Sequence, residues 1–464
     1  MSKKKVVRKK HIAMIMAAII AGVILSIAFM NYTSTEDGLV VKDEIVYFII
    51  VSLVILAIAL VVMLLAMAFG KKGSSISNTP IRIKNLPFNF SGMPASNKKE
   101  EEEDGGSRFY TLSSIDANKA KYQKGGHNEK ISLREFCEDF RNFAGSKLKL
   151  YYSIDDIRRF IAGMAVSKIV ILQGMSGTGK TSLAFAMGEF LSNPSSVIPV
   201  QPMWKERTDL VGYYNEFTKR FNETTLLQKM YEANYSKDIY VTILDEFNIA
   251  RVEYYFAEFL SLLEIPDPER RNLDVVSDEW ENDPIQLNEG RMKLPNNMWF
   301  IGTANNDDST FAISDKVYDR ALPINIDTKG VYFEAPYTEN LNLSYKHLEK
   351  MFDEAKAKYK VSEENLKKLE VLDDYVIEHF RLAFGNRIVK QLRDFVPVYV
   401  ACGGTEIDGI DYVLANKILR KFESLNLAFI RDEIEGLISY LSELFGRENM
   451  GESKAYLSRL QKLF

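Results

Sequence analysis

The chain has few of the residues that form disulfide and transition-metal sites. Its 464 residues include two cysteines and four histidines. Cys137 and Cys402 lie far apart in the sequence, and neither they nor the histidines show the spacing of metal ligands. We therefore expect no disulfide framework and two buried or idle thiols, which fits a reducing compartment.

The chain also lacks an excess of positive charge. It carries 59 Lys and Arg against 63 Asp and Glu, a formal net charge of −4. Nucleic-acid binding needs a basic face, because the protein must neutralise phosphates. The composition therefore argues against nucleic acid as a partner. At this length the chain has room for two or three domains.

Two long uncharged runs stand near the N-terminus, at residues 12–30 and 45–69. Each is long enough to cross a hydrocarbon core of ~30 Å as a helix. Lysines and arginines flank the outer ends of the pair, whereas the loop between the runs is mainly acidic. By the positive-inside rule, we expect residues 1–70 to form a two-helix transmembrane hairpin in the cell membrane, with both termini cytoplasmic.

Two alternatives compete with this hairpin. The first run could be a cleaved signal peptide, but no small-residue cleavage site follows it. Both runs could be buried core helices, but uninterrupted apolar runs of this length disfavour that interpretation. The hairpin is therefore preferred.

Residues 71–130 are punctuated by glycine, serine and proline and include a charge run at 98–104. Such a segment buries too little apolar surface to offset its chain entropy, so we predict a mostly disordered linker. A docking role for residues 81–90, which have some strand character, is the alternative. Order is expected from residue 131, where Ser132 and Glu135 resemble a capping box that opens a helix.

A glycine-rich segment, GMSGTGKT, occupies residues 174–181 between an apolar run at 168–173 and a helix-forming segment. The pattern G-x-x-x-x-G-K-[ST] between a strand and a helix is typical of a phosphate-binding loop. Its backbone N–H groups and the helix N-terminus would contact phosphate oxygens. A chance match is the alternative, and the complete context disfavours it.

The loop predicts a bound nucleoside triphosphate with Mg²⁺. Lys180 would reach the β- and γ-phosphates, and the Thr181 hydroxyl would bind Mg²⁺. The expected nucleotide-binding residues are Gly174, Met175, Ser176, Gly177, Thr178, Gly179, Lys180, Thr181 and Ser182.

An acidic pair, Asp245-Glu246, ends the apolar run at residues 239–244. In an open α/β sheet, ligands bind beyond the carboxyl ends of the strands, so this pair is expected beside the phosphate loop. Asp245 would hold Mg²⁺, and Glu246 would orient and deprotonate the attacking water. Acidic pairs after strands are common, and this one gains weight from the loop that precedes it.

Two more polar residues are candidates for the same chemistry. Asn305 follows the apolar run at 298–303 and could hold the attacking water with Glu246, or it could simply open a turn. Arg320 ends a short helical segment that begins at Ser314. It could be a solvated helix cap, or it could reach the γ-phosphate of a neighbouring subunit.

Taken in order, the phosphate loop, the acidic pair, the strand end at Asn305 and the Asp319-Arg320 pair resemble an AAA+ ATPase. Residues 209–215 and 245–248 are similar to the McrB/MoxR branch, which includes the dynein-related AAA modules. The resemblance covers residues 150–464. The membrane hairpin is not part of the common family pattern.

The resemblance implies an α/β P-loop NTPase fold. A parallel sheet with flanking helices would occupy residues 131–335, and an all-α lid residues 336–464. Asn305 would be the first-sensor residue and Arg320 the arginine finger acting in trans. Arg387, in the segment 385–391, would be a second sensor near the γ-phosphate of its own subunit. ATP and a homo-oligomeric ring, a hexamer by family habit, are implied in the same way.

The chain departs from the branch at three places. Relatives usually follow the acidic pair with Asn-Arg, whereas here Asn248 is followed by Ile249 and the arginine is displaced to Arg251. Relatives usually have Asp-Arg-Ser after the sensor Asn, whereas here the residues 308–310 are Asp-Ser-Thr. Arg320 is a single arginine where relatives often have two. Arg320 is therefore the only finger candidate in that segment.

The leading functional hypothesis is a membrane-anchored ATPase that remodels an unidentified protein partner on the cytoplasmic side. One alternative is a nucleotide-gated membrane scaffold with little turnover. Another is an McrB-like, GTP-driven module of a restriction or defence system, which the acidic balance disfavours.

Overall fold

The computed structural model describes residues 107–305, 310–327, 329–425 and 427–462. The chain divides into two compact units, residues 1–90 and 91–464, and every described residue belongs to the second. The expected hairpin, at residues 12–30 and 45–69, therefore lies outside the described residues. Within the described ranges, no helix is both long and apolar enough to cross a membrane.

A five-stranded parallel sheet forms the centre of this unit, with strand order β10-β1-β9-β5-β2. Its strands are β1 (Ile169–Gly174), β2 (Ser196–Pro199), β5 (Tyr240–Asp245), β9 (Met298–Asn305) and β10 (Leu322–Asn325). The expected α/β fold with a parallel sheet is confirmed. Because all five strands run the same way, the residues at their carboxyl ends meet at one edge of the sheet.

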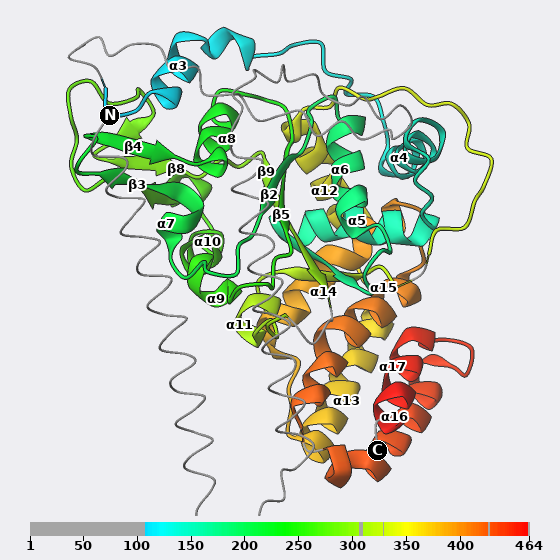
Figure 1. The fold of residues 1–464 in the computed structure, drawn as a ribbon. Helices are drawn as coiled ribbons and strands as arrows, with labels where there is room; N and C mark the ends of the chain where they lie inside the picture. Colours follow the sequence, from blue (N-terminus) through cyan, green and yellow to red (C-terminus); the bar gives the residue numbers. More distant parts are fainter. Residues whose placement is uncertain (1–106, 306–309, 328, 426, 463–464) are drawn as a thin grey trace, which may run out of the picture. The chain divides into compact units, whose positions relative to one another are not determined.

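Both faces of the sheet are covered, as the continuous burial of β1 requires. Side chains alternate between faces along a strand, so Val170 and Leu172 join one apolar cluster while Ile169 and Ile171 join another. Figure 1 shows α5 and α6 on one side of the strands and α8 on the other. The bounds of the core helices are α4 (Leu133–Leu148), α5 (Ile154–Val166), α6 (Lys180–Phe190), α7 (Arg207–Val211), α8 (Thr225–Ala233), α9 (Val252–Tyr255), α10 (Ala257–Leu262) and α11 (Asp315–Tyr318).

The predicted capping box is confirmed, since Ser132 and Glu135 form it at the start of α4. The next helix, α5, is capped by Ser153, which accepts the Asp156 N–H. Residues 252–262 form two short helices, because Phe256 interrupts the helical backbone between α9 and α10.

Two small antiparallel sheets extend the core. One is the hairpin of β3 (Gly212–Asn215) and β4 (Arg220–Glu223), and the other joins β6 (Asn272–Asp274), β8 (Arg291–Lys293) and β7 (Leu287–Asn288). The β7–β8 pair is antiparallel, with Leu287 opposite Met292.

The last part of the expected linker is folded. Residues 107–130 include α3 (Thr111–Ala117) and the turn η1 (Lys119–Lys121). The Glu223 carboxylate accepts the backbone N–H groups of residues 110–112 at 2.7–3.0 Å, and the Phe109 ring stacks on Phe221 at 4.9 Å. These long-range contacts correct the boundary at residue 131, because they supply partners that the local sequence lacks.

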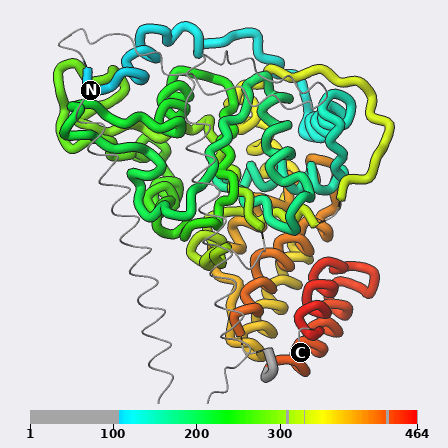
Figure 2. Tube along the Cα trace, in the orientation of Figure 1, coloured from blue at the N-terminus to red at the C-terminus, as the bar shows by residue number. Residues whose placement is uncertain are grey.

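A long connection leads from β10 to the C-terminal helices. In Figure 2 it is the yellow tube that passes outside α4. Arg141 of α4 lies over the Phe333 ring at 3.7 Å, and Lys147 pairs with Glu339 at 2.6 Å. The predicted boundary between residues 335 and 336 falls within this connection.

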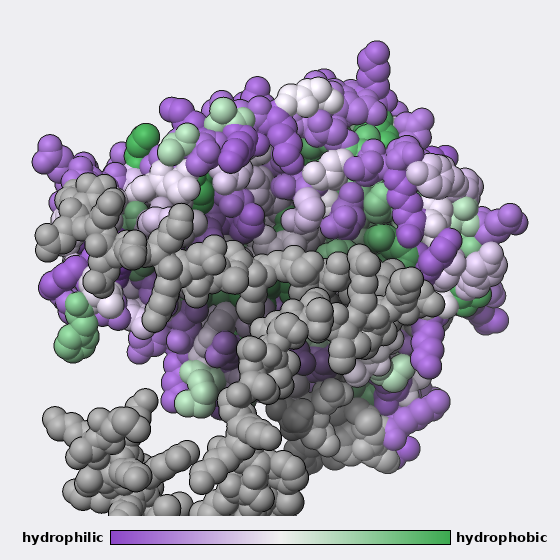
Figure 3. Space-filling model, turned by 45° about the horizontal axis from the view of Figure 1, so that its top comes forward, coloured by the Kyte–Doolittle hydropathy of each residue, from purple (hydrophilic) through white to green (hydrophobic). Residues whose placement is uncertain are grey.

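The C-terminal region is helical, as predicted. Its elements are α12 (Tyr345–Lys358), α13 (Glu363–Phe380), α14 (Gly385–Ala401), α15 (Glu406–Val413), η3 (Leu414–Ile418), η4 (Leu419–Ser424), α16 (Leu427–Phe445) and α17 (Gly451–Gln461). We call this region the lid. Its buried side chains belong to the same apolar cluster as α4, α5 and α6, so the lid and the core share packing. The visible surface in Figure 3 is mostly hydrophilic, with apolar side chains scattered over it.

Candidate functional site

The glycine-rich loop lies between β1 and α6, as predicted. Gly174, Gly177 and Gly179 adopt φ values of 140°, 79° and 92°. L-residues rarely adopt these angles, so the path of the loop depends on glycine. At Gly174 a Cβ atom would also lie 2.6 Å from the Ile326 carbonyl oxygen. The loop is therefore a tightly constrained backbone cradle.

Lys180 begins α6 and points back into this cradle. It is only 6% exposed, and its Nζ donates to the carbonyl oxygens of Gly174 at 3.1 Å and Met175 at 2.7 Å. The buried Tyr152 hydroxyl donates to the Gly179 carbonyl at 2.9 Å, and burial raises the pKa of that hydroxyl. The ammonium group thus lies within the curve of the loop.

The next helical residue joins the loop to the acidic pair. Thr181 Oγ1 donates to Asp245 Oδ1 at 2.7 Å, and Thr303 Oγ1 donates to the same oxygen at 2.8 Å. These residues come from α6, β5 and β9, so three elements converge at the carboxyl edge. A hydroxyl beside a carboxylate is a donor set that suits Mg²⁺, which favours oxygen ligands.

Glu246 has an unusual backbone. Its φ is 54°, which is uncommon for a residue with a side chain, and its N–H donates to Thr303 Oγ1 at 3.1 Å. The residue is exposed, although the strand that precedes it is buried. Strain of this kind, of order 1–3 kcal/mol, persists where surrounding contacts fix it.

Asn305 ends β9 directly beside the loop, in register with Gly174. Its carbonyl accepts from Asn248 Nδ2 at 3.0 Å. Asn248 Oδ1 is buried and has no hydrogen-bond partner among the described residues. Both asparagines, with Met175 and Ser176 of the loop, line a cavity of about 760 Å³.

The lid contributes cations to the same cavity. Arg420 of η4 and Arg459 of α17 line it together with the loop and Asn305. Arg420 also lies over the Tyr318 ring at 3.5 Å. Sequence reasoning missed both arginines, because they belong to no motif and reach the loop only through the packing of the lid.

Arg320 lies at the opposite edge of the sheet. Its backbone carbonyl accepts from Ser167 Oγ at 2.8 Å, just before β1 begins. The six residues of β1, at ~3.3 Å each, put the two edges roughly 20 Å apart. Arg320 therefore lies far from the phosphate loop of its own subunit.

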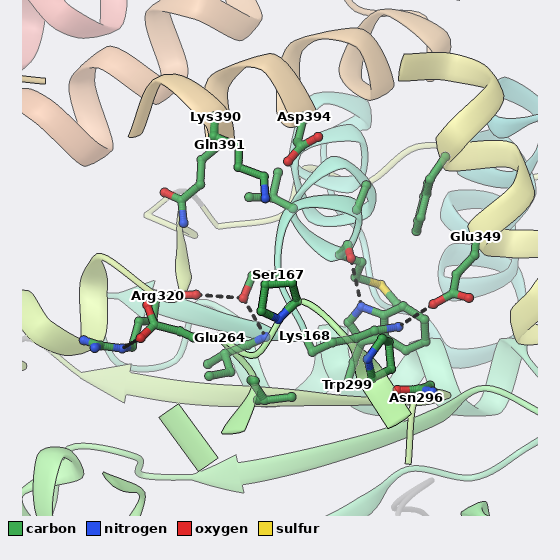
Figure 4. A pocket seen from close by; sticks show the side chains of 18 of the residues that line it. Ser167, Lys168, Glu264, Asn296, Trp299, Arg320, Glu349, Lys390, Gln391 and Asp394 are labelled. Atoms are coloured by element: carbon green, nitrogen blue, oxygen red, sulfur yellow. Dashed lines mark hydrogen bonds and ion pairs between the residues drawn. The ribbon is translucent and has the colours of Figure 1, made fainter. Parts of the chain in front are cut away.

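Arg387 lies near Arg320 rather than near the phosphate loop. Glu264 forms ion pairs with both, at 2.8 Å to Arg320 Nε and through its other oxygen to Arg387 Nη2. The three line a cavity of about 1170 Å³ between the amino edge and α12 and α14 (Figure 4). The resemblance implied that Arg387 lies near the γ-phosphate of its own subunit. In the structure it lies beside Glu264 in the cavity at the amino edge instead.

The same cavity contains a second ion-pair cluster. Lys168 Nζ pairs with Glu349 at 3.0 Å and lies 3.4 Å above the Trp299 ring, as Figure 4 shows. Burial lowers the pKa of Lys168 to about 8, against the opposing effect of Glu349. The cavity thus carries charges of both signs.

Comparison with known proteins identifies the core. Residues 169–321 match the family model of the AAA domain (dynein-related subfamily). This part of the chain is therefore an AAA domain, and it spans β1 to the segment before β10, including the phosphate loop, the acidic pair, Asn305 and Arg320. None of the curated proteins matches the chain.

Two solved structures are similar in fold at low identity. One is a candidate ATPase from Cytophaga hutchinsonii, with 14% identity and a TM-score of 0.44, covering 71% of this chain and 96% of that one. The other is a full-length MCM homologue from Methanopyrus kandleri, with 13% identity and a TM-score of 0.34, covering 63% of this chain and 61% of that one. At these values neither likeness informs the function.

Proposed function

We propose that this chain is an ATPase whose nucleotide site lies at the carboxyl edge of the sheet and is completed by a second copy of the chain. The observation that carries the proposal is the contact of Thr181 Oγ1 with Asp245 Oδ1 at 2.7 Å, beside the strained Glu246. A site for nucleotide binding alone would not need that glutamate.

Each residue has a role in this proposal. The loop N–H groups and Lys180 bind the phosphates, and Thr181 and Asp245 hold Mg²⁺, which would neutralise charge that develops on the phosphates. Glu246 accepts a proton from the attacking water, and Asn305 orients that water. The loop contacts phosphates only, so the choice of ATP rests on the resemblance.

The amino-edge arginines favour an oligomer. Arg320 and Arg387 lie roughly 20 Å from their own phosphate loop, judged from the length of β1. In a head-to-tail ring, the amino edge of one subunit can face the carboxyl edge of the next. We propose that both arginines act in trans in a ring, which we expect to be a hexamer. This replaces a role for Arg387 within its own subunit.

Two exposed aromatic residues support contact with a protein partner. Phe217, in the turn between β3 and β4, is 98% exposed, and Tyr213 on β3 is 49% exposed. Exposed aromatic side chains are typical of contact surfaces. We propose that the ATPase remodels a protein partner, and that residues 12–30 and 45–69 anchor it at the cytoplasmic face of the cell membrane.

Phosphate release by the full chain, purified in detergent, tests the catalytic assignment. Glu246→Gln should retain nucleotide binding and lose turnover by about 10²–10⁴-fold, the usual contribution of a general base. Equal rates in the variant and the unmodified protein would contradict the assignment. Nucleotide-dependent assembly with negligible turnover in both would instead support the scaffold alternative.

A further inference from the structure

The backbone that carries Arg320 is held by side chains from outside its own segment. Residues 318–321 connect the end of α11 to the start of β10, and the last carbonyl groups of a helix have no partners within it. Lys417 Nζ donates to the carbonyl oxygen of residue 318 and, at 2.8 Å, to that of residue 321. Gln391 Nε2 donates to the carbonyl of residue 319 at 3.0 Å, and Ser167 Oγ donates to the carbonyl of Arg320 at 2.8 Å. Side chains of the lid thus hydrogen-bond to three of these four carbonyls.

Lys417 is an unusual residue to find in this place. It is 4% exposed and lies in η3, a π-helical turn of the lid. Such turns are rare and are frequent at functional sites. A cation at a helix C-terminus is favourable, because it faces the negative end of the helix dipole. Burial lowers the pKa of this amine to about 7, which shows how costly its charge is there.

Gln391 is placed in the same way. It is 8% exposed on α14, one turn after Arg387, and Figure 4 shows it above the Arg320 segment. Its Oε1 is buried without a partner among the described residues, and within these residues its amide hydrogen-bonds to the carbonyl of residue 319 alone. The geometry therefore favours this contact over any other role.

The same lid turn also reaches toward the phosphate loop. Asn416, the neighbour of Lys417, accepts from Asn325 Nδ2 at 2.6 Å, and Asn325 accepts from Gln173 Nε2 at 2.7 Å. Gln173 immediately precedes the loop, and it also accepts from the Tyr318 hydroxyl at 2.7 Å. One turn of the lid thus contacts both ends of β10.

We propose that Lys417 and Gln391 are positioning residues that fix the backbone beneath Arg320. The lid of one subunit would thereby orient the arginine that reaches the nucleotide site of the neighbouring subunit. This inference rests on the proposed function, because it assumes that Arg320 acts in trans. Neither residue lines the cavity beside the phosphate loop of its own subunit. A loss on substitution should therefore appear at the neighbouring site.

The test uses Lys417→Met and, as a milder change, Gln391→Leu in the full chain. Both should retain binding of a fluorescent ATP analogue. Turnover should fall by about 100-fold for Lys417→Met, the effect of misplacing a catalytic group by ~1 Å. Lys454→Met is the matched control, because Lys454 also donates to backbone carbonyls, including that of Arg447 at 2.9 Å, but only within the lid. It should keep normal turnover.

Mixing subunits separates positioning from a general loss of structure. Lys180→Ala subunits lack the phosphate-binding lysine but keep an intact Arg320 segment. When they are mixed with Lys417→Met subunits, about a quarter of the interfaces in a random ring combine a working site with a working arginine. Two inactive proteins should therefore regain turnover together.

The outcomes distinguish the two proposals. A mixture of Lys180→Ala with Arg320→Ala should regain turnover if Arg320 acts in trans, and failure of this pair overturns the trans arrangement. If that pair regains turnover but the Lys417→Met mixture does not, only the positioning inference is overturned. If Lys417→Met is too unstable to assemble, the same mixture with Gln391→Leu decides the question.

Discussion

At the carboxyl edge of the central sheet, the functional side chains hydrogen-bond to one another, whereas at the amino edge two arginines are ion-paired to a single glutamate. In the proposed function, the first arrangement would hold a metal and phosphates within one subunit. The second presents two cations that share the carboxylate of Glu264, which another anion could replace. On the proposed function, the difference predicts that nucleotide binding and turnover can be separated by substitution.

The largest expected effect comes from the amino edge. Arg320→Ala should lower turnover by about 10³-fold or more, because an arginine supplied in trans stabilises charge on the transferring phosphoryl group. Nucleotide affinity should stay within about threefold, since Arg320 lies far from its own loop. Phosphate release and fluorescent-nucleotide titration measure the two quantities. Arg291→Ala, which removes an exposed ion pair with Asp274, is the control.

The carboxyl edge can be broken through its backbone. Gly174→Ala should destabilise the fold by about 3 kcal/mol, because the new methyl group would meet the Ile326 carbonyl at 2.6 Å in a left-handed conformation. At Gly177 the added methyl group would have no atom within 4 Å, so Gly177→Ala should lower the unfolding free energy by only about 1 kcal/mol. Urea unfolding compares the two, and equal losses would show that the cradle is not constrained as described.

Lys417 predicts a pH dependence at the amino edge. Burial lowers its pKa to about 7 in the folded protein, with Asp319 opposing and Arg420, Lys421 and Arg387 reinforcing that change. Between this value and the unfolded pKa near ~10.4, the unfolded chain binds the extra proton, so stability rises with pH. From pH 7 to 9, Lys417→Met should reduce that rise by about 2 kcal/mol. An unchanged slope would show that the lysine is not desolvated.

The smallest effect is expected at Glu264. Its ion pairs with Arg320 and Arg387 are partly exposed, so Glu264→Gln should change the unfolding free energy by less than about 1 kcal/mol. Turnover of the assembled protein should not fall, because the glutamate competes with the neighbour's phosphates for the arginines. A drop comparable to that of Arg320→Ala would mean that Glu264 itself takes part in catalysis.

The positions of the residues at the carboxyl edge could largely be predicted from the sequence. Its residues lie in or directly after apolar strands, and parallel strands place their ends together, so Thr181, Asp245 and Asn305 could be assigned before any geometry was known. The positions of the residues at the amino edge could not be predicted in this way. The sequence around Arg387 marks this arginine as a candidate, but the packing of α14 decides which edge of the sheet it faces.

The missed features share one physical cause, which is contact between distant segments. Phe109 and Arg108 are buried against residues more than a hundred positions away, so composition alone marked them as linker. Gln391 and Lys417 bind backbone carbonyls, and every residue has a carbonyl, so the sequence does not show which one is bound. Local sequence predicts the elements, and only tertiary packing shows these pairs.

The burial of Arg108, near the first of the described residues, has a mechanical consequence. Arg108 pairs with Asp283 at 2.7 Å, both side chains almost fully buried, and its carbonyl accepts the Phe221 N–H at 2.8 Å. Tension arriving along the preceding chain would therefore load the β3–β4 hairpin and the Asp283 loop rather than unravel a free end. The hairpin that exposes Phe217 is also the element that would bear that pull.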